Sequence, residues 1–246
     1  AVIAVSEGTR KDVLASYPQL DPAKVHVVHN GIDAQAWAPD RSDAAFEIAR
    51  RHGVDPERPS IVFVGRITRQ KGVPFLLRAM RQVPANVQLV FCAGAPDTPE
   101  ILEEVKGLVD ELRTVRSAPV VWIDEMLPRT EVIALLSAAT VFVCPSVYEP
   151  LGIMNLEAMA CEAAVVATAT GGIPEVVADG ETGWLVPIEQ LDDGTGTPVD
   201  PDKFVADLAA ALTEAVSDPQ EARRRGQAGR ARAVEKFGWD AIAAKT

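Results

Sequence analysis

The sequence predicts an α/β fold, a Rossmann-like parallel sheet with helices on both faces. Short runs rich in β-branched residues alternate with longer segments that carry apolar residues at helical spacing. The short runs are apolar along their whole length, which is typical of parallel strands covered on both sides. The expected strands are residues 2–5, 61–64, 87–92, 119–123, 140–144, 164–168 and 184–186.

Amphipathic segments follow these strands and predict the covering helices. After the segment at 191–202, the chain contains only helical patterns. The expected helices are residues 73–80, 101–113 and 131–139, a segment from Ile153, and residues 202–217, 219–236 and 239–245.

Two regions fall outside this alternation. Residues 1–40 indicate the last strand and helix of a preceding domain plus an interdomain linker, so that residues 41–246 form a second domain. The Gly-, Asp- and Pro-rich segment at 191–202 indicates a surface loop. The chain opens inside an apolar strand pattern without the features of a signal peptide, so we expect it to begin within a longer protein.

The charge balance argues against nucleic acid and membranes as partners. The formal net charge is −11 and the pI is near 4.8, which repels phosphate backbones and anionic lipids. No apolar run approaches the roughly 18 residues that a membrane span needs. The densest basic cluster, Arg223–Arg225, is expected to be a solvated helix face.

Neither the cysteines nor the histidines have the spacing of a metal or catalytic site. Cys92, Cys144 and Cys161 lie among apolar residues, which favours reduced, buried thiols and a cytoplasmic location. The three histidines are expected to be structural or solvated, and His29, beside the linker, is also a candidate for lining an interdomain cleft.

The loop GRITRQKG at 65–72 is a candidate anion site. It leaves an apolar strand and places Arg66 and Lys71 at the strand's carboxyl end, beside a helix N-terminus whose free N–H groups favour anions. A diphosphate fits this chemistry, and solvated loop charges are the alternative. The loop lacks the P-loop and dinucleotide glycine patterns.

A second candidate loop, PSVYEPLG at 145–152, precedes the helix from Ile153. Its Leu151–Gly152 turn can present backbone N–H groups to a phosphate or sugar oxygen. Glu149 lies in the loop and Glu157 in the helix, and carboxylates accept hydrogen bonds from vicinal hydroxyls. Two carboxylates beside a phosphate site favour a ligand with two diols, such as a nucleotide sugar. The alternative is a surface acid and a helix-start acid.

Three segments resemble the C-terminal half of the retaining glycosyltransferases of family 4, which have the two-domain GT-B fold. The pieces CAGAPDTPE, GRITRQKG and PSVYEPLGI are most similar to the actinobacterial glycogen synthase or α-maltose-1-phosphate synthase branch. The three segments are GRITRQKG, VFVCPSVYEPLGIMNLEAMAC at 141–161 and TATGGIPEVVADGETGWLVP at 168–187.

The resemblance implies roles for individual residues. Arg66 and Lys71 match the pair that holds the donor diphosphate. Glu149 and Glu157 match the E-x7-E motif, the first near the transferred sugar and the second on the ribose. The implied catalytic residues are Arg66, Lys71 and Glu149, and the implied donor-binding residues are Gly65, Arg66, Lys71, Gly94, Met126, Leu127, Glu149, Leu151, Gly152, Ile153 and Glu157.

Two further segments bear on the match. Gly171–Gly172 and Glu175 match a Gly-Gly-x-Pro-Glu element that the resemblance places behind the pocket, in a structural role. The run CEAAVVA at 161–167 departs from the family, because relatives have a Gly-x-Pro turn there. The connection must therefore be made around Glu162 without Gly or Pro.

The resemblance implies transfer of glucose from ADP-glucose, or alternatively UDP-glucose, to an α-glucan or glucose 1-phosphate. It implies no cofactor or metal. The expected partners are the missing N-terminal domain and a second copy of the chain. The fragment alone is expected to bind donor without turnover. Another family 4 activity and a non-catalytic nucleotide-binding module stay open. A dinucleotide oxidoreductase is disfavoured because no glycine fingerprint follows a strand.

Overall fold

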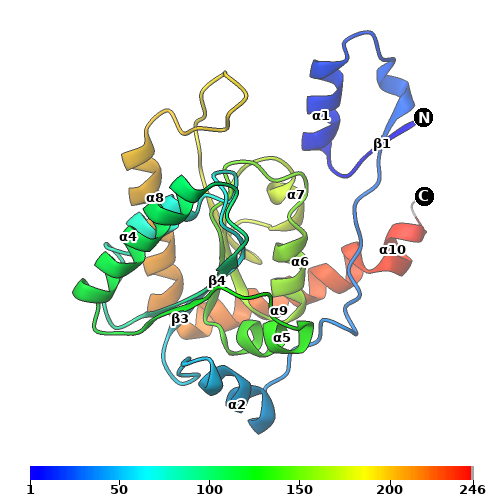
Figure 1. Cartoon of the computed structure of the whole chain (residues 1–246). Helices are drawn as coiled ribbons and strands as arrows, with labels where there is room; N and C mark the ends of the chain where they lie inside the picture. The colour runs from blue at the N-terminus through cyan, green and yellow to red at the C-terminus, as the bar shows by residue number, and fades with distance from the viewer. Residues whose placement is uncertain (245–246) are drawn as a thin grey trace.

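The computed structural model describes residues 1–244 and contains a six-stranded parallel sheet with helices on both faces (Figure 1). The strand order is β5-β4-β3-β6-β7-β8, so the chain runs outward from β3 to β5 and returns to β6 on the other side of β3. This reversal opens a crevice at the carboxyl ends of β3 and β6. The strands are β3 (Ser60–Arg66), β4 (Gln88–Gly94), β5 (Val120–Ile123), β6 (Val141–Cys144), β7 (Ala164–Thr168) and β8 (Gly183–Val186).

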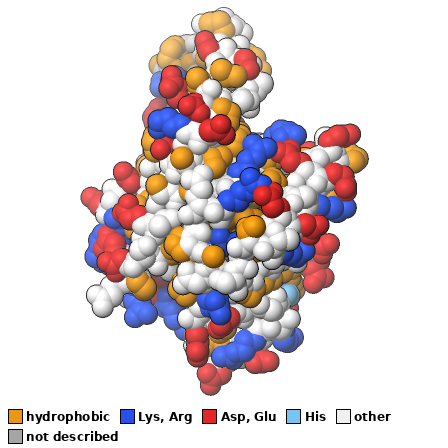
Figure 2. All heavy atoms as spheres, turned by 90° about the vertical axis from the view of Figure 1, so that its left-hand side faces the viewer, with side chains coloured by type: hydrophobic (Ala, Val, Ile, Leu, Met, Phe, Trp, Pro, Cys, Tyr) orange, Lys and Arg blue, Asp and Glu red, His pale blue; other side chains and the backbone are white. Residues whose placement is uncertain are grey.

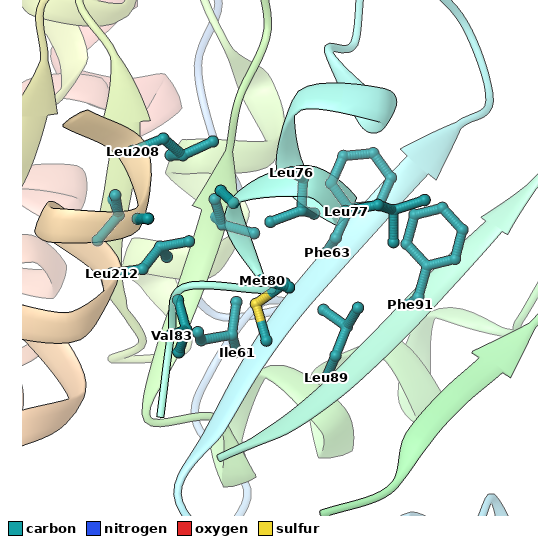
Figure 3. Close-up of a cluster of buried hydrophobic side chains, with 14 of the residues drawn as sticks. Ile61, Phe63, Leu76, Leu77, Met80, Val83, Leu89, Phe91, Leu208 and Leu212 are labelled. Atoms are coloured by element: carbon teal, nitrogen blue, oxygen red, sulfur yellow. The ribbon is translucent and has the colours of Figure 1, made fainter. Parts of the chain in front are cut away.

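The two faces of the sheet carry separate hydrophobic cores. Because strand side chains alternate, Ile61 and Phe63 of β3 join the core under α3, α4 and α8, while Val62 joins the core under α2, α5, α6 and α9. Figure 3 shows the first core, in which Leu76 of α3 and Met80, directly after α3, face the sheet. The helices are α2 (Asp43–Arg51), α3 (Val73–Ala79), α4 (Pro99–Val115), α5 (Arg129–Ala138), α6 (Ile153–Ala160), α7 (Ile173–Val176), α8 (Pro201–Ser217), α9 (Pro219–Phe237) and α10 (Trp239–Ala243). The predicted fold class is confirmed.

The first 27 residues form a small unit at the upper right of Figure 1. It consists of β1 (Val2–Ala4), α1 (Glu7–Ser16), a 3₁₀ turn and β2 (Val25–Val27), and the two strands pair in parallel. The sequence predicted only one strand here, because β1 lies in a continuous apolar run, whereas His26 interrupts the three residues of β2. Residues 28–42 connect this unit to α2. A domain boundary at residue 40 stays a prediction.

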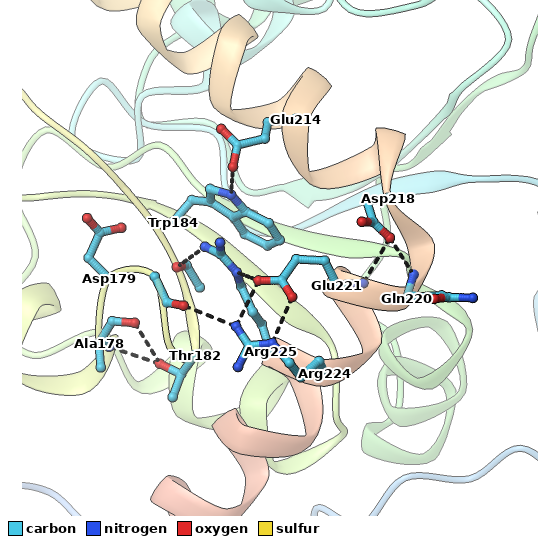
Figure 4. Close-up of polar contacts among 12 residues, drawn as sticks. Ala178, Asp179, Thr182, Trp184, Glu214, Asp218, Gln220, Glu221, Arg224 and Arg225 are labelled. Atoms are coloured by element: carbon cyan, nitrogen blue, oxygen red, sulfur yellow. Dashed lines mark hydrogen bonds and ion pairs between the residues drawn. The ribbon is translucent and has the colours of Figure 1, made fainter.

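The last helices close the fold around β7 and β8. The prediction that Arg223–Arg225 form a solvated face was wrong for Arg225, whose guanidinium lies 3.8 Å from the centroid of the Trp184 ring (Figure 4). Glu221 accepts hydrogen bonds from Arg224 and Arg225, which lower the pKa of its carboxyl to about 2. A run of like charges in the sequence therefore conceals one cation that packs on an aromatic ring.

The final helix is shorter than expected and contacts the linker. The backbone N–H of Ile32 donates to Phe237 O at 2.7 Å, and the Trp239 ring occupies the space next to Gly31. Residue 245, where the sequence predicted the helix to end, lies outside the described residues.

The three cysteines are buried and unbonded, as predicted. Burial raises the pKa of the Cys92 and Cys161 thiols to about 12. All three thiols pack in the core on the α6 side of the sheet.

Glu162 makes the turn before β7, where the resemblance led us to expect Gly and Pro. Its φ is 61°, in the left-handed region that disfavours residues with a Cβ. Its carboxylate forms an ion pair with Arg41 at 2.8 Å. The departure from the family pattern is thus accommodated by a strained residue, and β7 starts as predicted.

Candidate functional site

A cavity of about 400 Å³ lies at the carboxyl ends of β3 and β6. The loop after each strand contributes polar side chains to it, as expected for the place where the strand order reverses. Val5 and Asn30, from the N-terminal part of the chain, line the cavity as well. Its predicted site residues are Lys71, Glu149, Leu151, Gly152 and Ile153.

A second cavity of about 320 Å³ adjoins the first, and Val64 lines both. It lies between the loops that follow β3, β4 and β5. Its predicted site residues are Gly65, Arg66, Gly94, Met126 and Leu127. All the predicted donor-binding residues except Glu157 therefore line one of two adjoining cavities.

Lys71 and Glu149 form the most closely paired charges of the first cavity. Lys71 Nζ lies 2.6 Å from Glu149 Oε2, and Ser146 Oγ donates to the same oxygen at 3.3 Å. The side chains are only 25% and 12% exposed, so solvent screens this pair less than a surface pair. The arrangement offers a cation and a carboxylate to one ligand, which suits a molecule with both phosphate and hydroxyl groups.

Two glycines permit close approaches around the cavity that a Cβ would block. Gly72 has a φ of 66°, and a Cβ there would lie 1.8 Å from Pro145 O. Gly152 has a φ of 94° and caps α6, and a Cβ there would lie 2.5 Å from the side-chain amide nitrogen of Asn155. The first amides of a helix lack acceptors within it. Those of Ile153 and Met154 are therefore available at the cavity, which both residues line.

Arg66 and Lys71 lie on different cavities. Arg66 is 64% exposed at the second cavity, where its guanidinium lies 3.4 Å from Asp97 Oδ1. The sequence predicted that the two cations hold one diphosphate. The adjoining positions are compatible with a ligand that extends through both cavities.

Glu157 lies one helical turn after Ile153, on the same side of α6. Within residues 1–244 its carboxylate has no hydrogen-bond or ion-pair partner. Partial burial raises the pKa of this carboxyl to about 7. Glu157 is therefore a carboxyl group that the protein itself leaves unsatisfied beside the crevice.

The first cavity is also lined by residues that the sequence did not predict, among them Ser146, Val5 and Asn30. Ser146 lies within the candidate loop three residues before Glu149, and its hydroxyl was a visible signal. Val5 and Asn30 come from the N-terminal region that had been assigned to another domain, and nothing in their sequence context pointed to the cavity.

Two other kinds of site have no candidate among the described residues. Within residues 1–244, no group of three or more His, Cys, Asp and Glu side chains is arranged to hold a metal ion. None of the helices in that range has the length and apolarity needed to cross a bilayer. Acidic and basic side chains are spread over the face shown in Figure 2.

Comparison with known proteins identifies the family. Residues 45–232 match the family described as glycosyl transferases group 1. The chain is 54% identical over all 246 residues to an alpha-maltose-1-phosphate synthase of Mycolicibacterium smegmatis, of which it covers 61%. The chain belongs to this family. The group 1 glycosyltransferase chain is also 32% identical over 228 residues to a glycogen synthase of Mycobacterium tuberculosis, covering 91% of itself and 47% of that protein.

Solved structures place this glycosyltransferase chain in the GT-B fold. It superposes on sucrose-phosphate synthase of Thermosynechococcus elongatus with a TM-score of 0.77 at 30% identity, covering 99% of itself and 56% of that chain. Superposition on Anabaena Alr3699/HepE, solved in complex with UDP-glucose, gives a TM-score of 0.80 at 22% identity. This match covers 99% of the present chain and 61% of that chain, and it shows the fold alone. The chain spans 47–61% of the length of these relatives and solved chains.

Proposed function

We propose that this chain is the donor-binding half of a retaining glucosyltransferase that uses ADP-glucose, with UDP-glucose as the alternative donor. The acceptor is an α-glucan or glucose 1-phosphate. The relatives that are 53–54% identical along the whole chain are alpha-maltose-1-phosphate synthases, and a glycogen synthase is also related, which supports glucose as the transferred sugar.

The observation that carries the proposal is the pair of adjoining cavities. The first offers Lys71, Glu149 and the free amides of α6 to a sugar and its phosphates. The second is lined by Gly94, Met126 and Leu127 and has the apolar character that suits a base. A nucleotide sugar has this sequence of chemical groups along its length.

The proposed chemistry is stabilisation of the leaving group. The bond between the sugar C1 and the phosphate oxygen breaks, and C1 forms a bond to the acceptor oxygen on the same face. The acceptor's proton passes to the departing phosphate oxygen. Lys71 and the α6 amides put positive potential where the phosphate charge develops, and Glu149 orients the sugar hydroxyls.

Calorimetric titration of this chain with ADP-glucose, UDP-glucose and NAD tests the proposal. We expect ADP-glucose to bind, and Lys71→Ala and Glu157→Ala each to weaken binding by about 10- to 100-fold. Lys203→Ala is the matched control, because Lys203 is exposed on α8 and pairs only with residues outside the crevice. NAD binding, or no nucleotide binding at a millimolar concentration, would overturn it.

Other group 1 activities are the second candidate. A D-inositol 3-phosphate glycosyltransferase of Kineococcus radiotolerans is 34% identical along the chain. Because the acceptor contacts lie largely outside these residues, only an assay of the longer protein with glucose 1-phosphate, glycogen and inositol phosphate separates the two. A non-catalytic module would bind donor and transfer to none of them. Cytoplasmic location and homo-oligomer formation stay predictions.

A further inference from the structure

Next to the first cavity, three backbone segments meet so closely that no side chain fits between them. They are the start of α1, the 145–152 loop and the start of α7. A Cβ on Gly8 would lie 2.8 Å from Gly171 C, and a Cβ on Gly172 would lie 2.4 Å from Pro150 O. The N-terminal unit is therefore packed directly on the loop that carries Glu149.

Glu175 connects α1 to this junction. Its carboxylate accepts hydrogen bonds from the backbone N–H groups of Glu7 and Gly8 at 3.0 and 3.2 Å, and His29 Nε2 lies 2.9 Å from Glu175 Oε2. The first amides of α1 have no acceptor inside the helix, and a carboxylate at a helix N-terminus is favourable. The backbone oxygen of Glu175 is in turn held by Arg232 of α9 at 2.9 Å.

The same junction holds the backbone on either side of the Glu149–Pro150 peptide bond. The N–H of Gly172 donates to Glu149 O at 2.9 Å. At the next residue, the hydroxyls of Ser6 and Thr9 donate to Pro150 O at 2.5 and 3.2 Å. If α1 moves away, Pro150 O loses both donors. The backbone that sets the direction of the Glu149 side chain is then held only by the bond from Gly172 to Glu149 O.

We propose that Glu175 is a positioning residue, which locks the start of α1 onto the 145–152 loop and thereby fixes Glu149 in the first cavity. The donor site is then complete only while the N-terminal unit is docked. Docking of residues 6–9 and donor binding therefore favour each other. The effect on donor affinity rests on the proposed function, whereas the effect on the loop does not.

Hydrogen exchange without any ligand tests whether Glu175 holds α1 and the 145–152 loop together. Glu175→Ala removes all three contacts of the carboxylate, and Glu175→Gln keeps one acceptor oxygen, so we expect the alanine variant to have the larger effect. We expect exchange to rise by about tenfold both in residues 6–10 and in peptides 148–153 and 170–174, which report the Gly172–Glu149 bond. Glu47→Ala, exposed on α2, is the matched control. Faster exchange in residues 6–10 alone would overturn the coupling.

A second variant changes the contact between the same segments at α1 instead of α7. Ser6→Ala removes a donor to Pro150 O and leaves Glu175 intact. We expect faster exchange in the same peptides, and a double variant with Glu175→Ala that is less affected than the sum of the two, because each change undocks the same unit. Additive effects would show two independent contacts and would contradict the proposal.

Calorimetry with ADP-glucose tests whether Glu175 affects the affinity for the donor. If the unchanged chain binds, Glu175→Ala should weaken binding by about tenfold, although Glu175 lines neither cavity. Unchanged affinity in the variant would overturn the link to the donor. If the unchanged chain binds neither ADP-glucose nor UDP-glucose, the proposed function fails, and the exchange experiment still decides whether Glu175 positions the loop.

Discussion

The two cavities are bounded by loops of opposite character. The 145–152 loop of the first cavity is tightly held, since Leu151 is 2% exposed and the carbonyls of Glu149 and Pro150 both accept hydrogen bonds. The loop after β5, at the second cavity, leaves the side chain of Met126 97% exposed. The first cavity, proposed for the sugar and phosphates, therefore has a fixed wall, whereas the second, proposed for the base, has an exposed wall that is free to adapt.

The largest effect is expected where the first loop meets α7. Gly171→Ala would place a Cβ 2.0 Å from Glu149 O at a φ of 54°. We expect a loss of about 3 kcal/mol or more in the free energy of unfolding, measured in urea. Gly180→Ala is the control, because its φ of 74° is similar but its surroundings are empty, and it should lose only about 1 kcal/mol. Equal losses would show that packing at Gly171 contributes nothing.

Truncating one apolar side chain in each loop compares the two directly. Leu151→Ala removes a buried side chain and should cost about 2–4 kcal/mol in the free energy of unfolding. Met126→Ala should change it by less than about 0.5 kcal/mol, because nothing covers that side chain. Thermal unfolding of both variants measures the contrast. A Met126 variant as unstable as the Leu151 variant would refute the description of the second loop as open.

Glu157 should make stability depend on pH. Its folded-state pKa is about 7, above the unfolded value near 4.5, so the native state binds the proton more tightly. This group's stabilising contribution is therefore present below about pH 4.5 and is lost as the pH rises to about 7. We expect Glu157→Gln to match the parent at pH 4 and to be more stable by about 1–2 kcal/mol at pH 8, measured by urea unfolding. A difference that is independent of pH would contradict this.

The smallest effect is expected away from the crevice, at the turn before β7. Glu162→Gly relieves a left-handed φ of 61° but removes the ion pair with Arg41. We expect a gain of at most about 1 kcal/mol in the free energy of unfolding. In an Arg41→Ala background the ion pair is already absent, so the gain should be larger there. A loss in that background would mean that the backbone is not strained.

The sequence predicted the elements whose signal is local. The strands of the sheet were recognisable because each contains a short, mostly apolar run. The carboxyl-end rule placed Lys71 and Glu149 at one edge although they are far apart in sequence. The bounds still shifted at most ends by one or two residues.

What the sequence did not reveal depends on contacts between distant segments. Arg116 illustrates this, because its guanidinium donates to the backbone oxygens of Met80, Val83, Pro84 and Val87, and no pattern around it distinguishes it from a surface arginine. The same holds for Glu175, whose partners on α1 lie at the other end of the chain. The predicted site residues were found together, but the support behind them was not visible.

Val64 has a consequence of its own, because it lines both cavities. A ligand that extends through both therefore lies against this residue, and a compound that is too short reaches only one cavity. The crevice is thus expected to select by length as well as by chemistry. We expect a larger side chain at Val64 to obstruct a ligand of full length, and alanine there to leave it more room.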